Sequence, residues 1–442
     1  MSHLSATDPE ISQLIDEETD RQRNGLALIP SENHTSRSVL DALATTLSDK
    51  YAEGYPGRRY YSGNEVVDKV ETLVQDRAKK LFGVPYVNVQ PYSGSPANLA
   101  VYVATCEPGD PFMGLNLPDG GHLTHGWKFN ATAKIWKSIP YHIKPDGSFD
   151  FEEIRKLAQE NRPKLIWCGG TAIPRAIPFA EFAKVADEVG AYLVADISHI
   201  AGLIAGGAHE SPVPHVHIIT TTTHKTLRGP RGAMIMVTEK GFAKNPLLGE
   251  KIDKAIIPGL QGGPHMNTIA SIGVALKEAS DPAFATYAAN VVSNAKALAD
   301  ALIARGFSLV SGGTDNHLLI VDLTPTGAGR GKFFQLALEH AGLYANMNTV
   351  PGETVSALYP SGLRLGSPAA TTRGMGPKEM EQVAEWMKRV ADHINDQQLP
   401  AKEERAEAFK RFSAGLQDDP FYAELKKEVA TFCQTFPIPA GK

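Results

Sequence analysis

The sequence predicts an α/β fold in which a mostly parallel β-sheet is covered by helices on both faces. Residues 165–168 and, apart from Asp196, residues 192–197 form short apolar runs, and such continuous runs are typical of strands that are buried on both sides. Between them, residues 179–189 carry apolar side chains at i, i+3 and i+4, the spacing of an amphipathic helix. Gly190 follows where such a helix would end. Buried strands that alternate with amphipathic helices form layered α/β folds.

The remaining elements follow the same two periodicities. Helical spacing begins near residue 66, and helix and strand patterns alternate from there. The further predicted strands cover residues 86–90, 218–225, 233–237 and 318–323. The further predicted helices cover residues 66–78, 97–106, 283–306 and the charged segment from about 402 to the end.

Chain length and pattern together predict three parts. At 442 residues the chain is too long for one small core. Residues 1–55 are expected to form an N-terminal arm, because Ile11 and Leu14 stand at helical spacing among many charges. Residues 56–282 are expected to form a large domain, and residues 283–442 a smaller α+β domain.

The composition is that of an ordinary globular protein, with 42% apolar and 21% charged residues. The formal net charge of −5 gives no reason to expect nucleic acid or an anionic membrane as a partner. The three cysteines have no metal-like or redox-like spacing, and the N-terminus has no apolar targeting segment. No apolar stretch is long enough to span a bilayer. The expected location is therefore the cytoplasm.

Several common catalytic signatures are absent from the sequence. No dinucleotide glycine fingerprint follows a strand, and there is no Walker A loop, zinc-protease helix motif or nucleophile elbow. What remains is a set of candidates for phosphate binding, carboxylate binding and imine chemistry.

The first candidate is the segment 92–96, between a predicted strand and a predicted helix. Ser95 is expected to be the N-cap of that helix and Pro96 its first residue. Free backbone N–H groups and two hydroxyls at a helix N-terminus form a phosphate site. A well-formed cap without a ligand explains the same residues, and this segment alone favours that simpler interpretation.

Asp196 comes at the C-terminal end of a buried strand. A carboxylate there is costly unless a cation pairs with it, and ligands of open α/β sheets collect at the carboxyl ends of the strands. Asp196 is therefore a candidate partner for a protonated ring nitrogen, as in pyridoxal phosphate sites. An aspartate that caps the following helix explains this residue equally well.

Lys225 is expected to end a buried strand, after four threonines and before Arg228 and Arg231. Burial and nearby cations lower the pKa of a lysine amine, which is what imine formation needs. A lysine beside a basic turn is the ordinary interpretation, but this environment favours a functional one.

Two histidine pairs, His122 with His125 and His215 with His217, have spacings that metal sites also use. No third ligand of a suitable type is expected near either pair, so no metal site is predicted. His122 follows two glycines, and its flat ring is better suited to lie over an aromatic cofactor.

Several segments, in the same order along nearly the whole chain, resemble the serine hydroxymethyltransferase family. They are residues 30–33, 50–61, 89–95, 120–126, 220–232, 262–264, 311–317 and 361–364. The resemblance implies an aspartate-aminotransferase-like fold (fold type I of the pyridoxal-phosphate enzymes) and a homodimer or tetramer whose active sites use residues of two subunits. It also implies that L-serine and tetrahydrofolate are converted reversibly to glycine and 5,10-methylenetetrahydrofolate.

The resemblance further implies roles for individual residues. Pyridoxal 5'-phosphate would be bound covalently at Lys225 as a Schiff base, with Asp196 at the ring nitrogen and His122 stacked on the ring. The other implied cofactor-binding residues are Ser93, Gly94, Ser95, Thr171, His199, His224 and Gly262, with Gly263 and Tyr51 supplied by the neighbouring subunit. The other implied catalytic residues are Glu53, Tyr61, Thr222 and His224. The implied substrate-binding residues are Ser31, Tyr61 and Arg364 for the amino acid and Leu117, Gly121, Leu123, Asn348 and Leu358 for the folate.

The sequence departs from the family pattern at three positions. Thr171 stands where serine is usual, Ile173 where tyrosine is usual, and Met347 where lysine is usual. These changes leave open an α-methylserine hydroxymethyltransferase or a folate-independent 3-hydroxyamino-acid aldolase of the same family, although variation between lineages is the favoured explanation. A non-catalytic scaffold protein is disfavoured, because Lys225 and Asp196 are both present.

Overall fold

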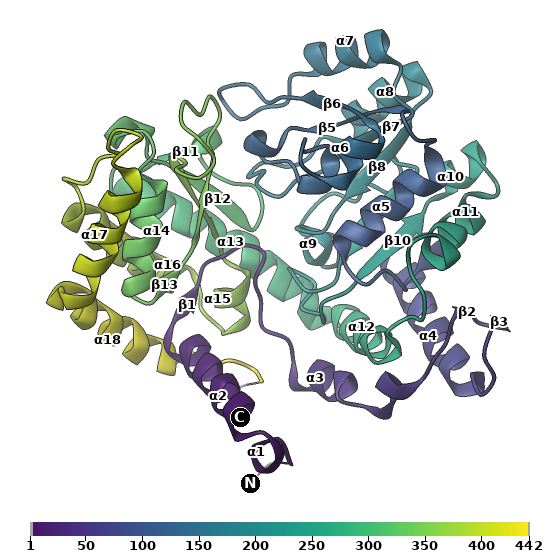
Figure 1. The fold of residues 1–442 in the computed structure, drawn as a ribbon, viewed down its shortest axis with the longest axis horizontal. Helices are drawn as coiled ribbons and strands as arrows, with labels where there is room; N and C mark the ends of the chain where they lie inside the picture. Colours follow the sequence, from purple (N-terminus) through teal and green to yellow (C-terminus); the bar gives the residue numbers. More distant parts are fainter. Residues whose placement is uncertain (1–2, 441–442) are drawn as a thin grey trace.

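The computed structural model describes residues 3–440, which form two lobes, each built on a β-sheet (Figure 1). The larger sheet has the strand order β4 (Tyr86–Asn88), β10 (Ala233–Val237), β9 (Ile218–Thr222), β8 (Tyr192–Asp196), β7 (Leu165–Cys168), β5 (Pro111–Leu115) and β6 (Lys137–Tyr141). Strand β10 is antiparallel to both of its neighbours, and the other pairs of this sheet are parallel. The prediction of a mostly parallel sheet is confirmed.

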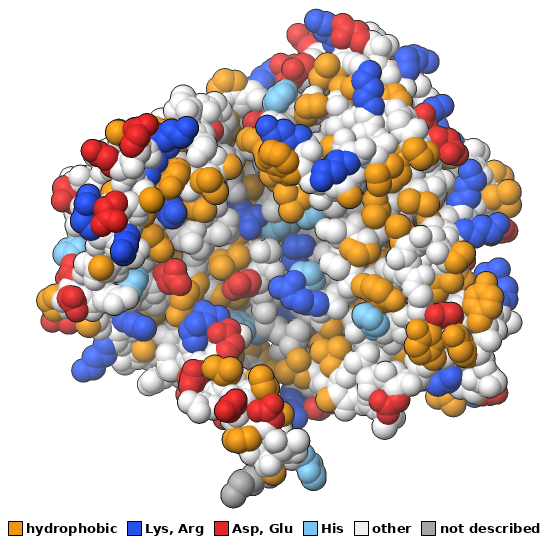
Figure 2. All heavy atoms as spheres, in the orientation of Figure 1, with side chains coloured by type: hydrophobic (Ala, Val, Ile, Leu, Met, Phe, Trp, Pro, Cys, Tyr) orange, Lys and Arg blue, Asp and Glu red, His pale blue; other side chains and the backbone are white. Residues whose placement is uncertain are grey.

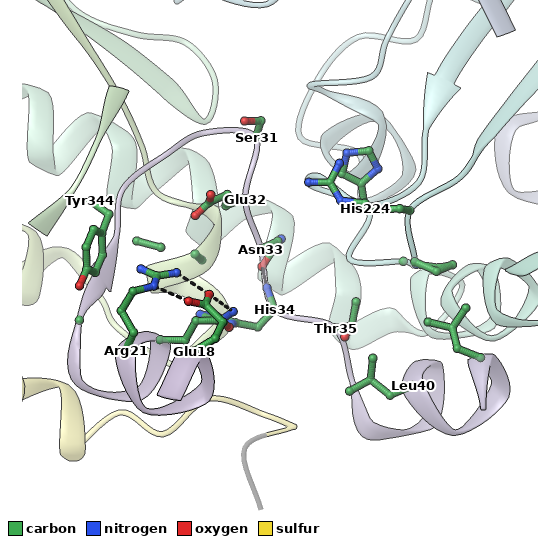
Figure 3. A pocket seen from close by; sticks show the side chains of 18 residues that line it. Glu18, Arg21, Ser31, Glu32, Asn33, His34, Thr35, Leu40, His224 and Tyr344 are labelled. Carbon is green, nitrogen blue, oxygen red and sulfur yellow. Dashed lines mark hydrogen bonds and ion pairs between the residues drawn. The ribbon is translucent and has the colours of Figure 1, made fainter. Parts of the chain in front are cut away.

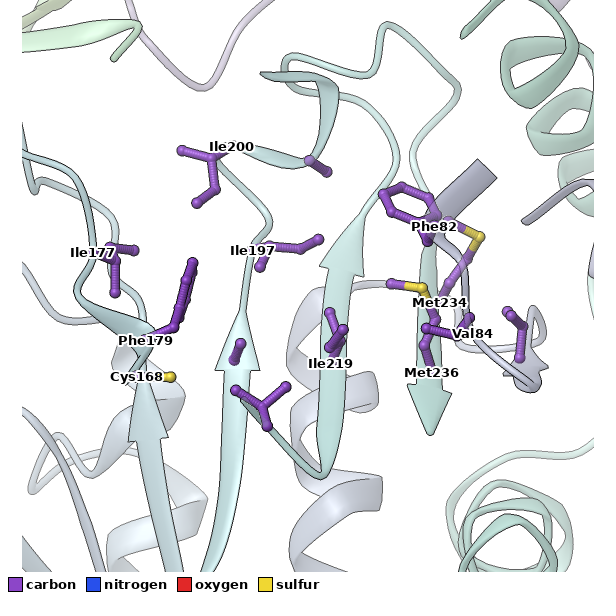
Figure 4. Packing of buried hydrophobic residues seen from close by; sticks show 14 of the residues in the cluster. Phe82, Val84, Cys168, Ile177, Phe179, Ile197, Ile200, Ile219, Met234 and Met236 are labelled. Carbon is purple, nitrogen blue, oxygen red and sulfur yellow. The ribbon is translucent and has the colours of Figure 1, made fainter. Parts of the chain in front are cut away.

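Successive residues of the central strands pack into two different apolar cores. On β10, Met234 and Met236 belong to one core, which Figure 4 shows, and Ile235 belongs to the other. The helices of the first core include α4 (Glu65–Phe82), α8 (Phe179–Val189) and α12 (Met266–Ala279), and those of the second include α5 (Gly94–Thr105) and α11 (Leu248–Lys254). Helices therefore cover both faces of the sheet, which explains why its strands are apolar without alternation.

The smaller sheet is antiparallel. Its strand order is β11 (Ser308–Leu309), β12 (Leu318–Asp322), β15 (Gly362–Gly366) and β14 (Asn346–Asn348). The helices that share its core include α14 (Gly331–His340), α16 (Pro377–His393), α17 (Arg405–Asp418) and α18 (Pro420–Gln434). Within residues 3–440, no helix combines the length and the apolar character that a membrane crossing requires.

The N-terminal segment packs against the smaller lobe before it reaches the larger one. Helix α2 (Pro9–Asn24) is followed by β1 (Leu26–Ala27), which pairs in parallel with β13 (Leu343–Tyr344). Leu26 and Leu28 are completely buried in the core of the smaller lobe. The start of the chain is therefore tied to the C-terminal third by packing.

One long helix, α13 (Pro282–Ala304), belongs to both lobes. Phe284 and Val291 pack into the core of the large sheet, whereas Leu298 and Leu302 pack into the core of the small one. The expected boundary after residue 282 coincides with the first residue of this helix, and the three-part domain division stays a prediction.

The predicted start of helix α5 is wrong. The helix begins at Gly94 with Ser93 as its N-cap, whereas Ser95 was expected to be the cap and Pro96 the first residue. Proline is tolerated throughout a first turn because the N–H groups there have no helical acceptor. A Cβ atom at Gly94 would lie 2.8 Å from the Thr222 side chain, so glycine lets the helix begin close to β9.

The predicted end of strand β9 is also wrong. The strand ends at Thr222, and Lys225 lies in the turn that follows, not in the strand. In this turn the Thr223 N–H donates to the Gly232 carbonyl at 3.1 Å, and the Gly229 N–H donates to the Thr223 carbonyl at 2.7 Å. These bonds fold the segment back toward β10 and place Lys225 at the edge of the sheet.

A buried arginine holds the segment that carries Glu53. Arg59 donates to the carbonyl oxygens of Ala52 and Gly54, on either side of Glu53, at 2.8 and 2.9 Å. It also donates to Glu71 on helix α4 at 2.6 Å, and the side chains of Arg59 and Glu71 are 4% and 0% exposed. The position of Glu53 therefore depends on an ion pair that is shielded from water.

We expect Glu71→Ala to lower the free energy of unfolding by about 3 kcal/mol, because it leaves the buried Arg59 charge only partly compensated. Denaturant unfolding followed by circular dichroism measures the change. The control is Glu188→Ala, whose partner Arg155 lies at 3.0 Å in a pair that is 37% and 39% exposed, and whose loss changes the free energy by less than about 1 kcal/mol. Equal effects of the two substitutions would contradict the prediction.

Candidate active site

Side chains from both lobes converge at one edge of the large sheet. Thr171 follows β7, Asp196 ends β8 and Lys225 follows β9, so all three lie at the carboxyl ends of parallel strands, where α/β sheets bind ligands. Arg364 on β15 reaches across from the smaller lobe and donates to the Thr171 carbonyl at 2.6 Å. A hollow runs between the lobes, and Lys or Arg and His side chains gather in it (Figure 2).

The Lys225 amine is partly buried and donates to Thr222 Oγ1 at 2.8 Å. Burial lowers the pKa of Lys225 to about 8, and the Arg364 and Arg231 cations act in the same direction, although Asp196 opposes them. An amine with this pKa is partly uncharged at neutral pH and can attack a carbonyl carbon.

The Asp196 carboxylate is buried and surrounded by donors. Oδ1 accepts from the Ser198 N–H at 3.1 Å, and Oδ2 accepts from Asn98 Nδ2 at 2.9 Å and lies 3.2 Å from His125 Nε2. Burial alone would raise the pKa of Asp196, but the His125 hydrogen bond and the histidine charges hold that pKa well below its ordinary value. Asp196 therefore stays ionised inside the sheet edge and can stabilise a cationic ring nitrogen.

His122 lies beside this carboxylate, with its Nδ1 atom 2.7 Å from Thr124 Oγ1. Burial lowers the pKa of His122 to about 4, so the ring is neutral at pH 7. Possible metal-binding atoms of His122, His125 and Asp196 lie within 4.8 Å of one another. The expectation that no third ligand lies near this histidine pair is wrong, because the fold brings the end of β8 against it. Asp196 already accepts hydrogen bonds, from Asn98 among others, which accounts for the cluster without an ion.

The N-terminus of α5 points its first backbone N–H groups out of the helix beside β9. Ser93 is the N-cap, and its hydroxyl makes no capping hydrogen bond within the described residues. Gly94 and Ser95 complete the first turn. Uncapped N–H groups and hydroxyls in this arrangement match an anionic oxygen ligand.

Arg364 is a buried cation, 6% exposed, that forms no ion pair with an acidic side chain of residues 3–440. Besides Thr171, its only other hydrogen-bond partner in that range is Asn346 Oδ1, at 3.1 Å. Burial lowers the pKa of Arg364 to about 10. A buried charge without a counter-ion is costly, so this arrangement favours an anionic ligand, and a carboxylate matches the guanidinium geometry.

Ser31 lies at the edge of a cavity of 330 Å³ that the N-terminal segment crosses. Figure 3 shows Ser31, Glu32 and Asn33 along this segment and His224 on the opposite side of the cavity. Burial lowers the pKa of His224 to about 3, so its ring is neutral at pH 7. Asn33 donates to the Lys225 carbonyl at 3.0 Å, which brings the segment with Ser31 against the lysine turn.

A family model for serine hydroxymethyltransferase matches residues 4–387. The chain belongs to the serine hydroxymethyltransferase family. A relative of that name from Acidothermus cellulolyticus is 56% identical over 409 residues, which cover 92% of this chain and 94% of the relative. Another from Sorangium cellulosum is 51% identical over 437 residues, which cover 99% of this chain and 96% of the relative. A third, from Desulfotalea psychrophila, is 48% identical over 439 residues, which cover 99% and 96%.

Membership in the serine hydroxymethyltransferase family confirms two predictions, fold type I and an enzyme of the transferase class. The family uses pyridoxal phosphate as its cofactor.

The segment with Tyr51, Glu53 and Tyr61 forms a separate group of side chains. The rings of Tyr51 and Tyr61 are in edge contact, with centroids 5.1 Å apart, and the residues are 57% and 48% exposed. Residues 262–263 lie against this group, since added Cβ atoms would lie 3.3 Å from Glu53 Oε1 and 3.2 Å from the Tyr51 ring. Within residues 3–440, no hydrogen bond or ion pair joins this group to Lys225.

The residues that the family resemblance assigns to folate differ in their surroundings. Asn348 lines a small cavity with Pro118 and Ile173. Leu123 and Leu358 are 45% and 70% exposed. Leu117 is the first residue of a one-turn helix, Leu117–Asp119, and Gly121 lies two residues after the end of that helix.

The departures from the family pattern lie in ordinary packing environments. Ile173 is 7% exposed and belongs to the core of the large sheet. Met347 lies on β14, where its N–H donates to Gln335 Oε1 at 2.7 Å. Thr171 keeps a hydroxyl and offers its carbonyl to Arg364.

Sequence reasoning missed Asn33, Asn98 and His317. Asn98 left a signal, because it is a polar residue in an otherwise apolar helix and is 1% exposed. Asn33 and His317 left no local signal, since their partners Lys225 and His199 lie 192 and 118 positions away in the chain.

We expect Lys225 in cofactor-free protein to react with an amine-specific acylating reagent with a pH midpoint near 8. The reaction needs the uncharged amine, so labelling rises as the pH increases through the pKa. Mass spectrometry of the Lys225 peptide measures it. Asp196→Asn removes the charge that favours the ammonium form and should lower the midpoint, whereas Arg231→Gln should raise it. A wild-type midpoint near the ordinary lysine value of 10.5 would rule out this environment.

Proposed function

We propose that the chain catalyses the reversible conversion of L-serine and tetrahydrofolate to glycine and 5,10-methylenetetrahydrofolate, with pyridoxal 5'-phosphate bound covalently at Lys225. The observation that carries this proposal is the presence, at one sheet edge, of an amine with a lowered pKa and a buried carboxylate held ionised, Lys225 and Asp196. Membership in the serine hydroxymethyltransferase family supports it.

The residues around this edge fit the cofactor. Asp196 would pair with its protonated ring nitrogen, the neutral ring of His122 would lie against its ring, and residues 93–95 would bind its phosphate. Thr171 and His199 would lie near its ring oxygen, and the buried His199 Nε2 atom, which has no partner within the described chain, supports a ligand there. When bound, the cofactor supplies an electron sink for the negative charge that develops at the substrate Cα.

Arg364 and Ser31 would bind the carboxylate of the amino acid. The support for this assignment is the lack of an acidic partner for Arg364 among the described residues, together with the position of Ser31 on the segment that Asn33 attaches to the lysine turn. A guanidinium that binds a carboxylate through two parallel bonds fixes its orientation. That orientation selects which bond at Cα breaks.

Thr222 and His224 would act next to Lys225. Thr222 Oγ1 accepts from the Lys225 amine and would orient it for attack. His224 is uncharged because of its burial, so it would not compete with Lys225 for a negatively charged group.

Glu53 and Tyr61 would exchange protons with the hydroxymethyl group in the active site of a second copy of the chain, and Tyr51 and Gly263 would contact the phosphate there. This assignment implies a homodimer or tetramer. Its support is that Tyr51 and Tyr61 are 57% and 48% exposed, and that no hydrogen bond or ion pair within residues 3–440 joins them to Lys225. The folate would lie along Leu117, Gly121, Leu123, Asn348 and Leu358. We also propose a cytoplasmic location, in line with three buried cysteines that form no disulfide.

A purified preparation tests the function directly. We expect turnover of L-serine only with tetrahydrofolate present, and little turnover of α-methylserine, because Ile173 is 7% exposed and packs in the apolar core of the large sheet. The control is Lys225→Ala, which should fold, show no visible absorbance of lysine-bound cofactor and lose at least about a thousandfold in turnover. Faster turnover of α-methylserine than of L-serine would contradict the proposal. Cleavage of L-serine mainly without tetrahydrofolate would also contradict it.

We expect Arg364→Lys to raise the KM for serine about 100-fold while the cofactor stays bound, because an ammonium cannot make two parallel bonds to a carboxylate. Steady-state kinetics and the visible spectrum measure both effects. The matched control is Arg305→Lys, at a partly exposed pair with Glu385, which should leave the KM unchanged. An unchanged KM in Arg364→Lys would exclude this residue as the carboxylate site.

A further inference from the structure

Two histidines from opposite lobes contact each other near Lys225 and Arg364. His199 follows β8 in the larger lobe, and His317 precedes β12 in the smaller lobe. His199 Nδ1 and His317 Nε2 are 3.0 Å apart, and the residues are 5% and 0% exposed. The predicted roles of the site leave His317 without a function.

Both rings are neutral at physiological pH. Burial lowers the pKa of His199 well below its ordinary value, and the Lys225 and Arg364 cations act in the same direction. Burial lowers the pKa of His317 to about 3, again with Arg364 nearby. A neutral imidazole carries one N–H and one lone pair. The bond between the rings therefore has a direction, and each direction assigns a different tautomer to His199.

The direction of this hydrogen bond decides which of the two outer ring nitrogens, His199 Nε2 or His317 Nδ1, carries a proton. His199 Nε2 and His317 Nδ1 are buried, and neither has a hydrogen-bond partner within the described residues. If His199 donates, its outer nitrogen presents a lone pair to the site and His317 keeps a buried, unpaired N–H. If His317 donates, the outer nitrogen of His199 presents an N–H, and His317 keeps a lone pair. Each arrangement leaves one buried N–H without a partner among the described residues, on His317 Nδ1 in the first and on His199 Nε2 in the second. The second is favoured because a cofactor oxygen can accept the His199 N–H, which removes the unpaired buried donor, and because it leaves the lone pair of His317 near the Arg364 cation.

The loop before His317 is held firmly against the larger lobe. Asn316 Nδ2 donates to the Ile173 carbonyl at 2.9 Å, and Thr314 Oγ1 donates to the Pro174 carbonyl at 3.0 Å. The N–H of Ser367, which follows β15, donates to the His317 carbonyl at 3.1 Å. The backbone at His317 is therefore fixed by contacts with both lobes that do not involve His199.

We infer that His317 donates its Nε2–H to His199 Nδ1 and thereby fixes His199 as the tautomer whose Nε2–H can donate to the ring oxygen of the cofactor. His317 is a positioning residue that acts through His199. The inference rests on the proposed function, because it takes pyridoxal phosphate as the group whose oxygen accepts this bond. It also makes the packing of the smaller lobe a condition for the correct proton placement in the larger lobe.

Two variants distinguish the effect of the His317 hydrogen-bond donor from the effect of the volume of its side chain. His317→Gln places an amide N–H₂ near the position of the imidazole Nε2 and keeps the donor, whereas His317→Leu keeps an apolar volume and removes it. Nitrogen-15 NMR of histidine-labelled, cofactor-free full-length protein reads the tautomer, with the His199 signals assigned from their loss in His199→Gln. Equilibrium titration with pyridoxal 5'-phosphate reads its binding. Circular dichroism checks that each variant is folded.

The expected result is a His199 ring protonated on Nε2 and bare on Nδ1 in wild type and in His317→Gln, and a mixture of tautomers in His317→Leu. Cofactor binding should weaken about tenfold in His317→Leu, the size of one lost hydrogen bond to a charged acceptor, and should stay within about threefold of wild type in His317→Gln. A wild-type His199 protonated on Nδ1, or equal binding by wild type and His317→Leu, would overturn the inference. The same holds if His317→Gln binds as weakly as His317→Leu. The NMR result does not depend on turnover, so a wild type that binds the cofactor but does not convert serine would refute the proposed function alone.

Discussion

The ionised Asp196 carboxylate inside the edge of the large sheet is the constraint on which the rest of the site depends. A buried charge of this kind persists only where donors surround it. The donors come from Asn98 on α5, from His125 and from the Ser198 backbone. Supplying them requires that α5 and the segment 122–125 both pack against the end of β8. The same packing brings the uncapped start of α5 and the neutral ring of His122 next to the carboxylate.

The second organising feature is the contact between the lobes. Arg364 lies on the smaller sheet but bonds to Thr171 after β7, and its charge adds to the burial that lowers the pKa of Lys225. Helix α13 joins the cores of both lobes, so the distance between them is set by packing along one rigid element. A residue of the smaller lobe therefore helps to set the pKa of the Lys225 amine. A change at the interface between the lobes can alter that pKa without direct contact with the lysine.

Local pattern was sufficient to predict the elements whose signals are local. The strand 165–168 and the helix 179–189 have the bounds that their periodicity indicates, and Gly190 ends that helix in the left-handed region, with φ of 72°. The sequence pattern gave a wrong N-cap for α5 at Ser95 and a wrong end for β9, because tertiary contacts determine which of several neighbouring residues begins a helix or ends a strand. It also failed at His125, whose proximity to Asp196 spans 71 positions. Contacts at that separation are set by the order of strands in the sheet, which residue periodicity does not encode.

The N-terminal segment shows why the site needs more than the two lobes. Asn33 donates to the Lys225 carbonyl and to Tyr287 Oη at 3.0 and 2.8 Å, and it accepts from Thr372 Oγ1 at 2.7 Å. One amide therefore joins the lysine turn, helix α13 and the smaller lobe. Because this amide uses both its donor and its acceptor, a shift of either lobe would break at least one of its bonds, at a cost of roughly 1–3 kcal/mol for each group left unpaired. The geometry around Lys225 is thus stabilised by bonds to parts of the chain that approach one another only in the complete fold.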